Sequence, residues 1–86
     1  MTVEALLTKL AEAHISHRAY RVLREIECSP ESMAHLAIVA ETSAQNMTGI
    51  VRRLLAKELV KRWEDGKHFM VGITAKGLQT LEGVGE

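Results

Sequence analysis

The sequence is short of several residue types, and each shortage excludes a class of protein. Its one cysteine, Cys28, excludes an internal disulfide and a zinc site built from cysteines, and the nearby Glu25 and Glu27 disfavour a reactive thiolate. Aromatic residues make up 3% of the 86 residues, so a core must be built from Leu, Ile, Val, Ala and Met. No apolar run is long enough for a membrane span, and the first residues do not resemble a signal peptide. We therefore expect a cytoplasmic protein with no membrane partner.

Arrangements of residues typical of catalysis and of metal binding are also absent from the sequence. No nucleophile–base pair, carboxylate pair or glycine-rich phosphate loop occurs in a usable context, so we expect no enzymatic activity and no cofactor. His14 and His17 are three residues apart, but a metal sensor needs three or four converging ligands, and His35 and His68 lie elsewhere in the chain. The sequence therefore predicts no metal site.

Charge is balanced over the chain but unevenly distributed. The 11 basic and 11 acidic residues cancel, which by itself argues against nucleic-acid binding. Between Ser43 and His68, however, six basic residues outnumber three acidic ones, a net charge of +3 that the remaining residues must offset. A basic segment on a neutral protein is typical of a local contact with nucleic acid.

Residues 33–58 have the pattern of two helices joined by a short turn. Leu36, Ala37 and Ala40 form an apolar stripe on the first helix. Apolar residues of the second helix recur at spacings of three and four, the period of a helix that lies on a core. They are Met47, Ile50, Val51 and Leu54. Because the hydroxyl of Ser43 can cap the second helix, we interpret the segment as a helix-turn-helix with a DNA-recognition helix.

Further helices are predicted on both sides of this segment. The first lies within residues 1–14, and a second, capped by Ser16, covers about residues 17–28. A last short helix, capped by Thr74, covers about residues 75–82. Basic residues on the outward face of the second helix either form a solvated surface or bind phosphates. They are Arg18, Arg21 and Arg24.

Two β-prone runs within residues 59–73 flank Asp65-Gly66. Asp-Gly is favoured in the type I′ turn of a hairpin, where both central residues have positive φ, so the runs predict a two-stranded β-hairpin. The pairs expected from this turn are Glu64 with Lys67 and Trp63 with His68.

Three helices followed directly by a hairpin define a winged helix-turn-helix. We predict a mainly α (α+β) fold with an N-terminal helix, a three-helix core, a two-stranded β-hairpin wing and a short C-terminal helix. We expect residues 1–86 to form a single domain, with the N-terminal helix in residues 1–14, the helix-turn-helix in residues 33–58 and the wing in residues 59–73.

The sequence resembles the MarR family of bacterial transcription regulators over roughly residues 15–81. The segments that carry the resemblance are Tyr20-Arg21-Val22-Leu23, Leu36-Ala37, Ser43 through Val51, Arg53-Leu54 and Leu59-Val60. Asp65-Gly66-Lys67 is similar to the Asp-x-Arg wing tip of that family. Ile73-Thr74-Ala75-Lys76-Gly77 is similar to its Leu-Thr-x-x-Gly motif. The resemblance implies a DNA-binding transcription regulator.

Three features depart from the MarR pattern. Glu41 stands where the turn of the helix-turn-helix usually has Gly, and Gly49 stands where the recognition helix often has Arg. The sequence also ends soon after Thr74, whereas MarR proteins use a long C-terminal helix to dimerise and to frame a ligand pocket. The resemblance therefore implies DNA binding but not small-molecule sensing, and the sequence identifies no effector.

The expected DNA contacts lie on the recognition helix and the wing. Gln and Asn can bond adenine through two hydrogen bonds, Arg can bond guanine or phosphate, and a basic wing tip is typical of a phosphate or minor-groove contact. Gly49 indicates either a close approach of the helix to DNA or sequence drift. The expected DNA-binding residues are Ser43, Ala44, Gln45, Asn46, Thr48, Gly49, Arg52, Arg53, Arg62, Lys67 and His68.

We hypothesise a nucleoid-associated regulator that binds specific double-stranded DNA in the major groove and represses by occluding a promoter. The alternative, favoured by the zero net charge and by Gly49, is a winged-helix protein-interaction module such as an anti-repressor or assembly subunit.

The N-terminal helix carries an apolar stripe that either packs on its own domain or forms a dimer interface. A single module of this size contacts few base pairs, so we expect a homodimer on a palindromic site. The expected interface residues are Val3, Leu6, Leu7 and Leu10.

Overall fold

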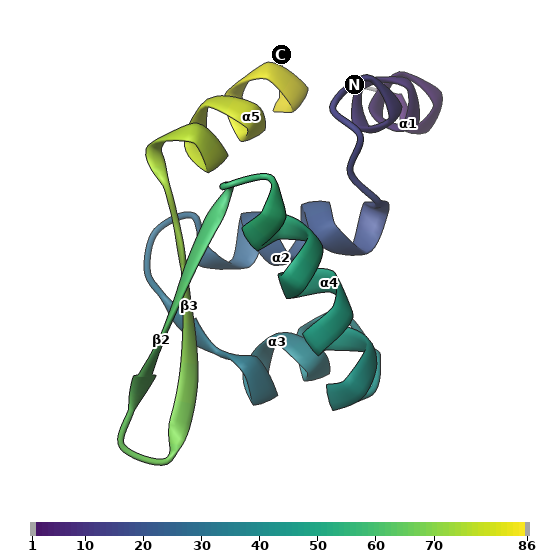
Figure 1. Ribbon diagram of the computed structural model, residues 1–86. Helices are drawn as coiled ribbons and strands as arrows, with labels where there is room; N and C mark the ends of the chain where they lie inside the picture. The colour runs from purple at the N-terminus through teal and green to yellow at the C-terminus, as the bar shows by residue number, and fades with distance from the viewer. Residues whose placement is uncertain (1, 86) are drawn as a thin grey trace.

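The computed structural model describes residues 2–85 and contains the five helices and the hairpin expected from the sequence. The helices are α1 (Val3–Glu12), α2 (His17–Ile26), α3 (Met33–Val39), α4 (Ala44–Ala56) and α5 (Ala75–Gly85). The strands are β1 (Glu31–Ser32), β2 (Val60–Asp65) and β3 (His68–Ile73). Helices α1 and α5 lie side by side at one end of the molecule, and the β2–β3 hairpin projects from the other end (Figure 1). The predicted fold class, a winged helix-turn-helix, is confirmed.

A hydroxyl side chain marks the start of each helix. In every case its oxygen accepts a hydrogen bond of 3.0–3.1 Å from the backbone N–H three residues later. Such caps stabilise a helix by about 1 kcal/mol each, because they satisfy a donor that has no partner within the helix. The capping residues are Thr2, Ser16, Ser32, Ser43 and Thr74.

Helices α2, α3 and α4 pack around an aliphatic core. The predicted stripe of α4 is buried along its whole length, and Leu36, Ala37 and Ala40 are buried opposite it. Leu23 and Ile26 of α2 complete the contact. This packing leaves the other face of α4 exposed to solvent.

Three helices end at a residue with positive φ that is not glycine: His14 (59°), Glu41 (53°) and Glu58 (61°). After α3, the backbone N–H of Glu41 donates to Ile38 and that of Thr42 donates to Ala37, which is the Schellman arrangement. The left-handed conformation costs a residue with a Cβ about 1 kcal/mol or more. The MarR preference for Gly at the position of Glu41 therefore has a direct conformational cause.

The motif Ile73-Thr74-Ala75-Lys76-Gly77 joins the wing to α5 at a crowded point. The hydroxyl of Thr74 donates to the carbonyl of Glu58 (2.8 Å), and its backbone N–H donates to the carbonyl of Leu59 (3.1 Å). A Cβ at position 77 would collide with the carbonyl oxygen of Leu59. Only glycine lets the first turn of α5 approach the backbone after α4 this closely.

The wing differs from the prediction in two respects. Asp65 pairs with His68 and Glu64 pairs with Phe69, so the predicted pairs of Glu64 with Lys67 and of Trp63 with His68 are wrong. The turn residues are Gly66 and Lys67, and positive φ falls on Gly66 (63°), as in a type II′ turn. A type I′ turn at Asp65-Gly66 would have required positive φ at Asp65 as well, so the turn lies one residue later.

The sheet also has three strands rather than the predicted two, because β1 pairs with the outer side of β3. Glu31 lies opposite Val71, and Ser32 lies opposite Met70. A two-residue strand is too short to show a period in the sequence.

Helix α1 divides its apolar stripe between the interior and the surface. Leu10 is buried and Leu6 is half-buried, whereas Val3 and Leu7 are 73% and 52% exposed. Lys9 extends towards α5, where its Nζ donates to the carbonyl of Gly83 (3.4 Å). None of the helices formed by residues 2–85 is long and apolar enough to cross a membrane.

Candidate nucleic-acid interface

The free face of α4 carries the polar residues predicted to contact DNA. Ser43, Gln45, Asn46, Arg52 and Arg53 are exposed, as is Ala44, and Thr48 and Gly49 are partly exposed. They lie opposite the buried stripe because apolar and polar residues recur along α4 with the period of an α-helix.

Hydrogen bonding separates these side chains into two groups. The hydroxyl of Ser43 accepts from the backbone N–H of Asn46 (3.1 Å), and that of Thr48 donates to the carbonyl of Ala44 (3.0 Å). Within residues 2–85, the side-chain amides of Gln45 and Asn46 form no hydrogen bonds, so both remain free to bond base edges.

The structure distinguishes the three outward-facing arginines of α2. Arg21 donates to the carbonyl of Val39 at the end of α3 (2.8 Å), and Arg24 forms an ion pair with Glu27 (3.0 Å). Arg18 forms no ion pair within residues 2–85 and lines an open hollow that α4 borders on its other side. Of the three, Arg18 is the one placed to meet a phosphate.

This hollow lies between the start of α2 and α4. Ser16, His17 and Arg18 line one side, and the other side is formed by α4. The residues from α4 are Gln45, Asn46, Gly49, Ile50 and Arg53. The helix α2 has no acidic residue in its first turn, so its positive end and Arg18 favour an anion here. The sequence by itself leaves the role of Arg18 open because the proximity of α2 to α4 is a tertiary contact.

A second hollow, of about 380 Å³, lies between the wing and the start of α4. The wing contributes Arg62, Lys67, His68 and Phe69, and α4 contributes Ala44 and Thr48. The guanidinium carbon of Arg62 lies 5.5 Å from the centre of the Phe69 ring, within the range of a cation–π contact. The ring thus contacts Arg62, a role for Phe69 that the sequence did not predict.

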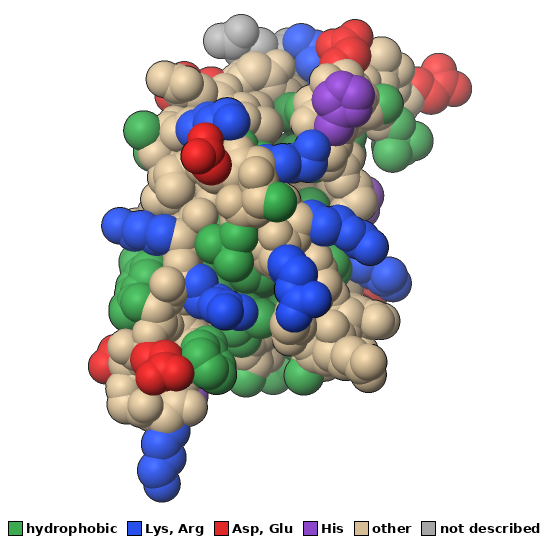
Figure 2. All heavy atoms as spheres, in the orientation of Figure 1, with side chains coloured by type: hydrophobic (Ala, Val, Ile, Leu, Met, Phe, Trp, Pro, Cys, Tyr) green, Lys and Arg blue, Asp and Glu red, His purple; other side chains and the backbone are tan. Residues whose placement is uncertain are grey.

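Both hollows border α4: Ala44 and Thr48 line the one beside the wing, and Gln45, Asn46 and Gly49 line the one beside α2. Figure 2 shows Lys and Arg side chains over this face and at the hairpin tip, with apolar surface between them. Acidic Glu64 and Asp65 are also exposed on the wing. Exposed basic residues therefore lie on α4, along β2 at Lys61 and Arg62, and at the turn at Lys67, with the two acidic residues between the last two positions.

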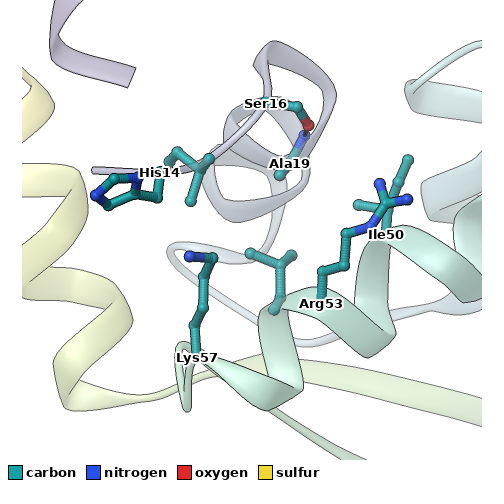
Figure 3. Close-up of a pocket in the computed structure, with 8 residues that line it drawn as sticks. His14, Ser16, Ala19, Ile50, Arg53 and Lys57 are labelled. Atoms are coloured by element: carbon teal, nitrogen blue, oxygen red, sulfur yellow. Dashed lines mark hydrogen bonds between the residues drawn. The ribbon is translucent and has the colours of Figure 1, made fainter. Parts of the chain in front are cut away.

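A smaller pocket of about 230 Å³ lies between α4 and the segment that joins α1 to α2 (Figure 3). Arg53 of α4 and Lys57, the residue that caps the end of α4, line one side, and His14 lies on the opposite side. Apolar Ile15 and Leu54 also line the pocket. Arg53 borders both this pocket and the hollow beside α2.

No family model matches the chain, and no curated protein matches its sequence. Solved structures do match it. NadR in complex with 4-hydroxyphenylacetate is 30% identical with a TM-score of 0.82, and the match covers 95% of this chain and 64% of NadR. The transcriptional regulator BldR from Sulfolobus solfataricus is 29% identical with a TM-score of 0.84, and the match covers 95% of this chain and 62% of BldR.

Staphylococcus aureus MepR, solved in complex with DNA, shares the fold. It is 18% identical with a TM-score of 0.84, and the match covers 92% of this chain and 68% of MepR. The transcriptional regulator Tm0710 from Thermotoga maritima is 25% identical with a TM-score of 0.81, and the match covers 87% of this chain and 56% of Tm0710. The chain spans less than two thirds of the length of Tm0710, BldR and NadR.

These solved structures are MarR-family winged-helix transcriptional regulators. The chain has their winged-helix fold, and the resemblance predicted from the sequence is confirmed.

Proposed function

We propose that the protein is a transcription regulator that binds specific double-stranded DNA. One observation carries the proposal: α4 bears the free amides of Gln45 and Asn46 and also borders the hollow lined by Arg62 and Lys67 of the wing. The fold match to MepR, which has been solved with DNA, supports the same use of this surface.

In this proposal, the first turns of α4 enter the major groove and read bases through Gln45 and Asn46. Arg52 and Arg53 bind phosphates along α4, and Arg18 adds a phosphate contact from α2. The wing, with Arg62, Lys67 and His68, follows the neighbouring DNA backbone. The close-fitting surface of α4 is supplied by Ser43, Ala44, Thr48 and Gly49. Residues 1–86 act as one winged-helix unit, and binding over a promoter represses transcription by occlusion.

We further propose that the protein binds DNA as a homodimer. Val3 and Leu7 present apolar surface on α1 beside the half-buried Leu6, while Leu10 anchors the helix to its own domain. Two copies would double the number of bases read and add their binding energies on a palindromic site.

A binding selection on random duplex DNA, followed by titration of the selected duplex at several salt concentrations, tests the function. We expect an enriched sequence and an affinity that falls steeply with salt, because phosphate contacts release counterions. A protein-interaction module, the alternative, would enrich no sequence and would show no salt-dependent DNA binding.

A second candidate function is control by a small anion, favoured by the pocket between Arg53, Lys57 and His14. NadR, which shares the fold, has been solved with 4-hydroxyphenylacetate. Because Arg53 borders both the pocket and the DNA surface, an aryl carboxylate bound there would draw Arg53 away from phosphate. We expect 4-hydroxyphenylacetate to release DNA from the parent but not from Lys57→Ala. Equal release from both proteins, or none from either, would exclude this role for the pocket.

A further inference from the structure

Away from the DNA surface, three side chains that can bind a metal converge from three elements. Glu25 lies on α2, Glu31 on β1 and His35 on α3. The Nε2 of His35 is 3.0 Å from a carboxylate oxygen of Glu25 and 3.9 Å from one of Glu31. All three ligand atoms lie within 4.8 Å of one another.

The charges of this cluster are not balanced. Within residues 2–85, the ion pairs of Glu25 and Glu31 are with His35, and neither carboxylate pairs with Lys or Arg. Two carboxylates thus share a single imidazole, and the cluster keeps an excess negative charge even when His35 is protonated. The hydrogen bond that His35 donates to Glu25, with the negative charges of Glu31 and Glu25, raises the pKa of His35 above its ordinary value despite the opposing effect of desolvation.

We propose that Glu25, Glu31 and His35 form a binding site for one divalent transition-metal ion of the zinc class. Bonds of about 2.0–2.2 Å to imidazole nitrogen and carboxylate oxygen place tetrahedral ligand atoms about 3.3–3.6 Å apart. The observed 3.0 and 3.9 Å bracket this separation, and rotation of the exposed glutamate side chains brings the third pair together. Water completes the coordination, because the three side chains are 33–43% exposed.

The chemistry of the ligands determines the class of ion. An imidazole with two carboxylates suits zinc or a neighbouring transition metal better than calcium or magnesium, which prefer oxygen ligands alone. The ion takes the position of the proton that lies between His35 and Glu25.

Such an ion would cross-link α2, β1 and α3, the elements that position the proposed DNA surface. Glu25 lies in the last turn of α2, and His35 lies in the first turn of α3, the first helix of the helix-turn-helix. Glu31 belongs to the strand that pairs with β3 of the wing. Bound metal would therefore stabilise the folded protein and fix the wing relative to the helices, whether or not the protein binds DNA.

The test is calorimetric titration of the metal-free full chain with Zn²⁺, with the His35 imidazole nitrogens followed by NMR. We expect one Zn²⁺ per chain and a shift of the Nε2 resonance on binding. His35→Ala and Glu31→Gln should each weaken binding by roughly tenfold or more, at least the loss that follows removal of an outer-shell partner. His17→Ala is the matched control, because His17 belongs to the closely spaced pair His14 and His17 and is not part of the proposed site, and this variant should bind Zn²⁺ like the parent.

Three results would overturn the proposal. The parent could bind no Zn²⁺ at millimolar concentration, His35→Ala could bind as tightly as the parent, or His17→Ala could lose as much affinity as His35→Ala. Circular dichroism establishes that each variant is folded. If His35→Ala unfolds, the isosteric Glu31→Gln variant decides the outcome.

Discussion

Gly49 lies in the middle of the proposed recognition helix, where glycine weakens the helix. A Cβ built at this position meets no atom of the protein within 4 Å, and φ there is not positive. Neither packing nor backbone conformation within the fold therefore requires glycine. Gly49→Ala should raise the free energy of unfolding by about 1 kcal/mol, the difference in helix propensity. For a domain of this size, the melting temperature should rise by roughly 4–8 °C.

The same methyl group should oppose DNA binding. Gly49 lies between Asn46 and Arg53 on the surface proposed to enter the major groove. If the helix approaches DNA closely here, an added methyl overpacks the interface at a cost of roughly 1–3 kcal/mol, a loss of about fivefold to more than a hundredfold in affinity. The prediction is a variant that is more stable but binds DNA more weakly.

Thermal unfolding by circular dichroism and fluorescence anisotropy on the selected duplex measure the two effects. Gly83→Ala is the control, because its Cβ would also meet nothing within 4 Å but lies on α5, away from the DNA surface. It should not change DNA affinity. Unchanged affinity in Gly49→Ala would refute the close approach, and an unchanged melting temperature would refute the argument that the fold leaves room for a side chain.

Five further substitutions test base recognition, phosphate contact, dimer assembly and backbone strain separately. Asn46→Ala should relax base preference at one or two positions at a cost of roughly 1–3 kcal/mol, which a repeated selection will measure. Arg53→Ala should instead weaken binding to all duplexes and lower the dependence of affinity on salt, which salt titrations will measure. Lys67→Glu should reduce affinity for every duplex with no change in the preferred sequence, and a changed preference would mean that the wing reads bases. Leu7→Glu, at a 52% exposed position, should leave the fold intact and shift sedimentation equilibrium from dimer to monomer, and a parent that stays monomeric would refute the dimer. Glu41→Gly should raise the free energy of unfolding by about 1 kcal/mol by relieving its positive φ of 53°, and denaturant unfolding with no gain would contradict that cause.

The sequence alone determined the helices, their caps and the buried face of α4. These features depend on residues three or four positions apart, so a hydroxyl at Ser43 or a stripe through Met47 and Leu54 can be read directly from the chain. The order of helices and hairpin then determined the fold, and the polar face of α4 indicated where DNA contacts belong.

The tertiary structure decided what depends on contacts between distant residues. The turn lies at Gly66-Lys67 because positive φ is tolerated best on glycine, and β1 becomes a strand only because β3 lies beside it. Burial of Leu10 but not Leu7 depends on how α1 packs against the rest of the fold. Glu25 and His35, ten positions apart and on different helices, meet only when α2 packs on α3. Periodicity records which face of an element is apolar, but not which other element will cover that face.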